Sequence, residues 1–142
     1  MRIKKEKNLI VARLETGENY LNSLLKIAQK EKISSGIILN SIGMLKNVEL
    51  AYFQGKGKYK RNRFKDPMEV TATQGNIGKT ENGKYKLHVH TTLADESGYA
   101  YAGHLEKGTV WVTAEILILK LDKVKFIRKL ENETGLYGLN LE

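Results

Sequence analysis

The sequence predicts an α+β domain with a central, mostly antiparallel β-sheet and one main helix. Only residues 17–32 place apolar side chains at helical spacing, whereas about seven segments have the length and apolar content of β-strands. Turn signals, among them Asn82-Gly83, separate those segments. One helix among many strands is the pattern of an α+β domain. A chain of 142 residues without a linker or internal repeat predicts a single domain over residues 1–142.

The first predicted elements are a strand and the helix. Residues 8–14 (NLIVARL) form an apolar run of strand length after a basic lead-in. Thr16 occupies the position of an N-cap, and Glu18 puts an acidic side chain where a first helical turn favours it. Lysines fill the C-terminal half of the predicted helix, and its apolar face consists of Leu21, Leu24, Leu25 and Ala28.

The remainder of the chain predicts strands and turns. Pro67 and three glycines are predicted to form turns between the strands. Residues 68–74 alternate apolar and polar side chains, which indicates a strand with one wet face. Residues 134–137 have too little pattern for an assignment. The predicted strands span residues 36–45, 48–54, 68–74, 85–94, 109–121 and 124–130.

Composition excludes several classes of protein. Without cysteine, the chain has neither a disulfide framework nor a thiolate metal site. No apolar run approaches the roughly 20 residues of a membrane span, and the basic N-terminus lacks the apolar region of a secretory signal. These features predict a cytoplasmic protein. The signatures of a P-loop, of a GxSxG hydrolase and of an HExxH metalloprotease are absent.

All three histidines of the chain lie within residues 88–104. His88 and His90 are two positions apart in a predicted strand, so their side chains project from the same face. The polar turn at residues 95–98 predicts a hairpin that brings His104 back beside them. Three neutral imidazoles suit a divalent transition metal with one coordination position left for water or a ligand.

Other interpretations of this region stay open. Two histidines at this spacing also occur on solvated strand faces that bind no metal. Asp95 or Glu96 could orient an imidazole, although both also suit the turn itself. Glu115 interrupts an apolar strand, so its carboxylate must face water or find a partner, and it is a candidate catalytic or interface residue.

A basic stretch at residues 55–65 (GKGKYKRNRFK) is the candidate nucleic-acid contact. Its cations alternate with glycines and two aromatic rings, which a phosphate backbone and unstacked bases would use. The candidate residues are Lys56, Lys58, Lys60, Arg61, Arg63 and Lys65. The net charge of +8 also permits a polyanionic partner, whereas a solvated loop or the lysine-rich composition of heat-adapted proteins explains the same charges without DNA. A second basic set at residues 120–129, including Arg128, predicts the outer face of the late strands.

The run from Leu87 to Leu119 resembles the core of the PPC (plants and prokaryotes conserved) domain. That family's pattern of HxH, a polar turn, GGHL and TxE is matched here. The matching residues are His88, His90, residues 95–98, Gly103-His104-Leu105 and Thr113-Ala114-Glu115. Further similar positions lie at residues 17–18, 41–43, 69–77 and 134–136.

The resemblance implies an α+β fold with a central antiparallel sheet, a homotrimer, and zinc or a similar metal on the three histidines. It also implies a candidate DNA-binding role, as prokaryotic members are usually described. Two departures stand out. Ala102 replaces the first glycine of GGHL, and the Arg-Gly-Arg-Pro core of the AT-hook in plant relatives is absent. Without that hook, DNA binding rests on charge and analogy.

Three functions are therefore in competition. The favoured one is a DNA-binding homotrimer of the PPC family with a zinc site at His88, His90 and His104. The alternative is a metal-dependent enzyme or small-molecule-binding protein that acts at the same histidines. In the third, the protein is an interaction scaffold with structural histidines. The sequence identifies no catalytic residue, and catalysis is not the expected role.

Overall fold

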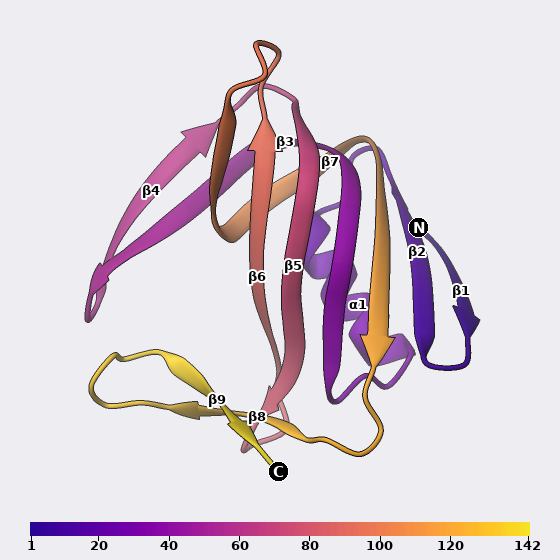
Figure 1. Ribbon diagram of the computed structural model, residues 1–142, viewed down its shortest axis with the longest axis vertical. Coiled ribbons are helices and arrows are strands. Elements are labelled where there is room, and N and C mark those ends of the chain that lie inside the picture. Colours follow the sequence, from indigo (N-terminus) through magenta and orange to yellow (C-terminus); the bar gives the residue numbers. More distant parts are fainter.

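The protein forms one strongly bent β-sheet with a single helix packed on one face (Figure 1). The computed structural model describes residues 1–142. The helix is α1 (Tyr20–Lys30), and the strands are β1 (Arg2–Glu6), β2 (Leu9–Glu15), β3 (Gly36–Gly55), β4 (Lys58–Phe64), β5 (Met68–Thr80), β6 (Tyr85–Ala94), β7 (Ala100–Lys120), β8 (Phe126–Leu130) and β9 (Tyr137–Leu141). All strand pairs are antiparallel except β5 with β8. The predicted α+β class is therefore confirmed.

Two long strands, β3 and β7, organise the sheet. They pair with each other over most of their length, and each also changes its second neighbour along the way. β3 pairs first with β5 and then with β4, and β7 pairs first with β6 and then with β2. Since β5 and β6 also pair, the four strands β3, β5, β6 and β7 form a closed circuit of hydrogen-bonded neighbours.

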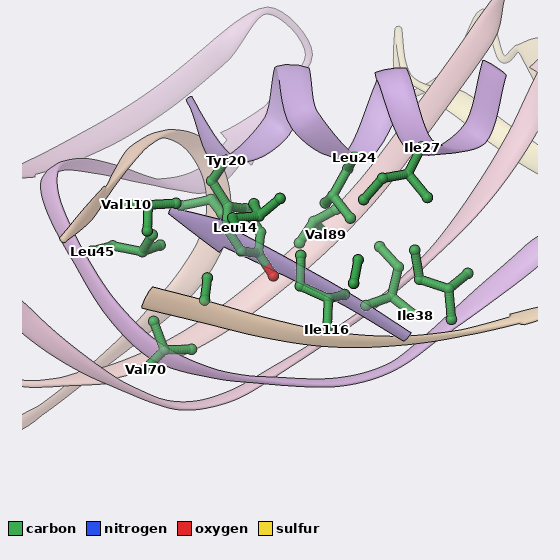
Figure 2. Close-up of a cluster of buried hydrophobic side chains, with 14 of the residues drawn as sticks. Leu14, Tyr20, Leu24, Ile27, Ile38, Leu45, Val70, Val89, Val110 and Ile116 are labelled. Atoms are coloured by element: carbon green, nitrogen blue, oxygen red, sulfur yellow. The ribbon is translucent and has the colours of Figure 1, made fainter. Parts of the chain in front are cut away.

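The hydrophobic core lies between α1 and the face of the sheet that it covers. Tyr20, Leu24 and Ile27 follow helical spacing and are fully buried. Figure 2 shows these side chains pointing from α1 toward strand residues that include Leu14 and Ile116. Strand alternation supplies the other half of the core, because every second residue of a strand points to the helix side.

The start of the helix differs from the prediction. α1 begins at Tyr20, and its N-cap is Asn19, whose side-chain oxygen accepts a hydrogen bond from the Asn22 amide at 2.9 Å. Thr16 instead donates to the Val112 carbonyl at 3.1 Å. Glu18 precedes the helix, where its carboxylate accepts from the Glu15 amide and pairs with the N-terminal amine. The loop before the helix therefore uses the polar residues that the sequence assigned to its first turn.

Several strands also differ from the predicted bounds. Residues 36–45 and 48–54 belong to one continuous strand, β3, which bends at register shifts between them. The basic stretch, expected as a loop, contains the strand β4. β1 and β9 were not predicted, and the last apolar segment begins at Phe126 rather than at residue 124. No helix is long and apolar enough to span a membrane.

Candidate metal centre and the adjoining groove

The three histidines lie together on the sheet face that points away from α1. His88 and His90 are two residues apart on β6, and His104 on β7 is the direct register partner of His90. The Nε2 atoms of His88 and His90 are 3.1 Å apart, and the three ring centroids are 4.9–5.4 Å from one another. The turn at residues 95–98 therefore forms the predicted hairpin and brings the histidines into one cluster.

Two of the imidazoles are held in the neutral state. Desolvation, followed by the charges of His90, Arg128 and His104, lowers the pKa of His88 to about 4. The His88 side chain is exposed, but its ring centroid lies only 4.9 and 5.3 Å from those of His90 and His104. Desolvation and the charge of His90 also lower the pKa of His104. A neutral imidazole has a free lone pair for a metal ion, so the cluster is ready to act as a ligand set near neutral pH.

The donor set fits a divalent transition ion. One ligand atom from each histidine lies within 4.8 Å of those of the other two. Zinc–nitrogen bonds are about 2.0–2.1 Å long, so two nitrogens on one ion are at most about 4 Å apart. His88 and His90 are exposed, so their side chains have room to rotate toward a shared ion. Three histidines would leave one coordination position of such an ion for water or a ligand.

The acidic and hydroxyl residues near the histidines have other contacts. Asp95 holds the turn, since its carboxylate accepts hydrogen bonds from the Ser97 and Tyr99 amides at 2.9 and 3.0 Å. Glu115 is exposed on β7, beside its register partners Arg13 and Ile42 and away from the histidine cluster. Thr91 is buried on the core face. None of these residues contacts an imidazole.

The candidate nucleic-acid residues lie along the β3–β4 hairpin, and two of them are neutralised. Arg61 donates to Glu106 at 2.6 and 3.1 Å, and Arg63 donates to Glu49 at 2.6 Å. The hydrogen bond from Arg63 lowers the pKa of Glu49. Lys58 and Lys60 are exposed on the opposite face of β4, and Lys65 follows the strand. The lysines, rather than the arginines, therefore supply the unpaired positive charge of this hairpin.

A groove of about 1150 Å³ adjoins the histidine cluster. One wall is the β3–β4 hairpin, with Phe53 and Tyr59, and the other is the C-terminal β8–β9 hairpin, with Tyr137. Figure 1 shows the two hairpins facing each other beside β6. Their tips touch, because the Lys56 ammonium donates a hydrogen bond to the Asn132 carbonyl. The histidines thus lie in the floor of a groove that two separate hairpins enclose.

Sequence reasoning missed Arg128, which also lines this groove. It is 5% exposed, although the sequence predicted an outer-face position. One Nη donates to the Tyr137 carbonyl at 2.9 Å and the other donates to the Asn76 side-chain oxygen. The signal was present in the alternation of β8, where Arg128 shares a face with the buried Phe126. An arginine on the buried face of a strand indicates that polar groups lie beneath it.

Comparisons with known proteins agree with this architecture. Residues 1–122 match the family model of the Plants and Prokaryotes Conserved (PCC) domain. A plant- and prokaryote-conserved (PPC) protein from Pyrococcus horikoshii is 31% identical, with a TM-score of 0.83 over 96% of this chain and 93% of that one. A candidate DNA-binding protein from Bacteroides thetaiotaomicron is 25% identical, with a TM-score of 0.91 over 98% and 96% of the two chains.

Two further similarities are more limited. A metal-containing protein from Archaeoglobus fulgidus has a TM-score of 0.84 over 98% of this chain and 95% of that one, and at 22% identity it shows a shared fold. The bifunctional protein GlmU from two Synechococcus strains is 26% identical over 131 residues, which is 92% of this chain. The chain spans only 20% of the length of these curated relatives.

Proposed function

The chain belongs to the Plants and Prokaryotes Conserved (PCC) domain family, and we propose that it is a metal-binding protein that takes a small-molecule ligand at its histidine cluster. His88, His90 and His104 are the proposed ligands of a zinc ion. The observation that carries this proposal is the position of three ligand atoms within 4.8 Å in the floor of a groove. A bound zinc ion would supply a Lewis acid at the open coordination position.

The protein's own residues define what else this site does. The sheet fixes the spacing of His90 and His104 as register partners, so the ligand set is preorganised by backbone pairing. The groove walls flank the histidines and limit the directions from which a ligand can approach them. No carboxylate or hydroxyl forms a hydrogen bond with the histidines that could transfer a proton, and we propose ligand binding rather than a catalysed reaction.

Metal analysis of protein purified without a histidine tag tests the metal site. After incubation with zinc and dialysis, we expect about one zinc ion per chain. His90→Ala should lower the metal content to a small fraction of that value. Gln74→Ala is the matched control, because Gln74 is the register partner of His90 on β5 and is not a proposed ligand. Equal metal content in wild-type protein and His90→Ala would contradict the proposal.

A second candidate function is DNA binding by a homotrimer. It is supported by the net charge of +8, by the exposed lysines of the β3–β4 hairpin, and by the naming of the Bacteroides relative as a candidate DNA-binding protein. In a homotrimer this hairpin would be present three times, which would increase avidity. The proposed contacts include all six cations of the stretch. We expect Lys58, Lys60 and Lys65 to contribute more than the ion-paired Arg61 and Arg63.

The salt dependence of duplex binding tests this second function. The logarithm of the binding constant should fall steeply with the logarithm of salt concentration. Changing Lys58, Lys60 and Lys65 together to Gln should reduce that slope by about 3, since each phosphate contact contributes about 0.9. The control changes Lys4, Lys5 and Lys7 of the β1 hairpin to Gln, which removes the same charge elsewhere. Absence of binding at low salt would overturn the DNA-binding proposal.

A further inference from the structure

The most unusual charged group in the molecule is the Arg128 guanidinium. It is 5% exposed, and its nearest partners are the Tyr137 carbonyl and the Asn76 side-chain oxygen, both of which are uncharged. Its Nε atom is buried without any hydrogen-bond partner. Burying a charge is unfavourable unless an opposite charge or a full set of hydrogen bonds compensates it. Neither is supplied by this chain.

The carboxylates closest to Arg128 in the chain are engaged elsewhere. On β8 itself, the neighbouring Lys129 forms ion pairs with Glu81 and Glu142. Its Nζ atom lies 3.7 and 3.9 Å from their carboxylate oxygens. Glu131 lines the groove, but its carboxylate accepts a hydrogen bond from the Thr134 hydroxyl at 3.2 Å and lies against Gly138. No carboxylate of this chain therefore pairs with the guanidinium, although Arg128 lines the groove.

The surroundings of Arg128 favour a negatively charged ligand that carries a ring. Lys86 adds a second cation to the groove, where its ammonium lies over the Tyr137 ring, 4.8 Å from the centroid. On the opposite wall, Phe53 and Tyr59 form an edge-to-face pair with centroids 5.4 Å apart. Tyr137 and this pair give the groove aromatic surface on both sides. A volume of about 1150 Å³ is ample for a small organic molecule.

We propose that the groove binds a small organic anion, with a carboxylate or phosphate group held by Arg128 and Lys86 and an aromatic ring held between the two hairpin walls. An oxyanion matches the planar fork of an arginine, which can donate two parallel hydrogen bonds. This inference deepens the proposed small-molecule site, and it assigns Arg128 as a specificity-determining residue. Binding of the acid group by Arg128 and Lys86 does not require the metal. The anion site and the metal site can therefore be disproved separately.

Calorimetric titration of phenyl phosphate into chelator-treated protein tests the anion site. We expect saturable binding to the wild-type chain, with Arg128→Gln weakening it about tenfold or more, because hydrogen bonds to charged groups are strong. Arg128→Lys keeps the charge without the fork and should bind with intermediate affinity. Arg2→Gln makes the same chemical change at an exposed residue and should leave binding unchanged.

Additional probes identify the chemistry of the ligand. Benzoate in place of phenyl phosphate shows which acid group the site favours, and inorganic phosphate shows what the ring contributes. Benzyl alcohol, which has a ring but no charge, should bind much more weakly than either acid. Because Arg128 is buried, circular dichroism must show that its variants are folded. Lys86→Gln on the exposed rim provides a second variant, with an expected weakening of a few-fold.

The outcomes separate this inference from the metal proposal. Anion binding that depends on Arg128 in a protein that takes up no zinc would support the anion site and contradict the metal site. Zinc uptake without binding of phenyl phosphate or benzoate at millimolar concentration would overturn the anion site alone. Equal affinity of wild-type protein and folded Arg128→Gln for both acids would also overturn it.

Discussion

At the scale of single residues, the histidine cluster links burial to protonation. His88 is partly desolvated and lies near two other imidazoles and the Arg128 guanidinium, and all of these lower the pKa of its ring. The unfolded chain has no such neighbours, and its histidines titrate near pH 6.5. Between pH 6.5 and about 4, the unfolded state therefore binds a proton that the folded state does not bind at His88.

This difference predicts that the metal-free protein loses stability on acidification. The contribution of neutral His88 is complete above pH 6.5, declines as the pH falls, and is lost near pH 4. Urea unfolding at several pH values in the presence of chelator measures it. The decline between pH 7 and 5 should be smaller in His88→Asn than in wild-type protein. Gln74→Ala should keep the wild-type decline, and an unchanged decline in His88→Asn would refute this explanation.

At the scale of elements, the sequence predicted the helix and the turns that depend only on local spacing of residues. The Asn82-Gly83 hairpin and the turn that returns His104 follow from turn chemistry over a few residues. Helical spacing predicted α1, but its buried face is centred on Tyr20, Leu24 and Ile27, and the predicted Leu21 and Leu25 are only partly buried. The continuity of β3 could not be predicted in this way. Its two halves have different partners, and the strand passes between them through a bend that only long-range pairing with β7 explains.

The groove could not be predicted from the sequence either. Its walls come from hairpins whose contacting residues, Lys56 and Asn132, are 76 positions apart. The histidines were identifiable because the whole set lies within one hairpin. Arg128 joins them only after β8 pairs in parallel with β5, and a parallel pair leaves no local turn signal. The sequence therefore revealed the proposed metal ligands but not the residues that would select a ligand.

The bend of β3 predicts a strong requirement for glycine at position 43. Gly43 has φ +130°, and a Cβ atom there would overlap the Thr113 carbonyl of β7. Gly43→Ala combines backbone strain with a steric clash and should destabilise the fold by about 3 kcal/mol or more. Gly17→Ala is the matched control, because Gly17 also has a positive φ but has open space around it. Its cost should be about 1–2 kcal/mol, and urea unfolding compares the two.

At the scale of the whole molecule, the two faces of the sheet differ. One face is covered by α1, whereas the other exposes apolar side chains on β2, β3 and β7. Val11 and Leu117 are register partners on this uncovered face, and Ile42 lies on the same face one strand away. Their exposed fractions are 43%, 38% and 47%. Adjacent exposed apolar residues are typical of a subunit interface, which supports the proposed homotrimer.

The homotrimer predicts that a charge on this face dissociates the protein. Leu117→Asp should shift the mass measured by light scattering from three chains to one, because burying an unpaired carboxylate in an interface is unfavourable. Val124→Asp serves as the control, since Val124 is similarly exposed but precedes β8, away from this face. A monomeric wild-type protein would refute the prediction.

The confinement of all three histidines to the β6–β7 hairpin also affects the order in which the site is assembled. Contacts that are close in sequence form early in folding and, during synthesis, soon after the segment leaves the ribosome. The proposed ligands are complete once residue 104 has been made, whereas Arg128 and Tyr137 arrive with the last strands. An ion captured by the nascent hairpin would then be present before the groove that selects its ligand. Metal loading would thus precede ligand recognition in the life of each chain.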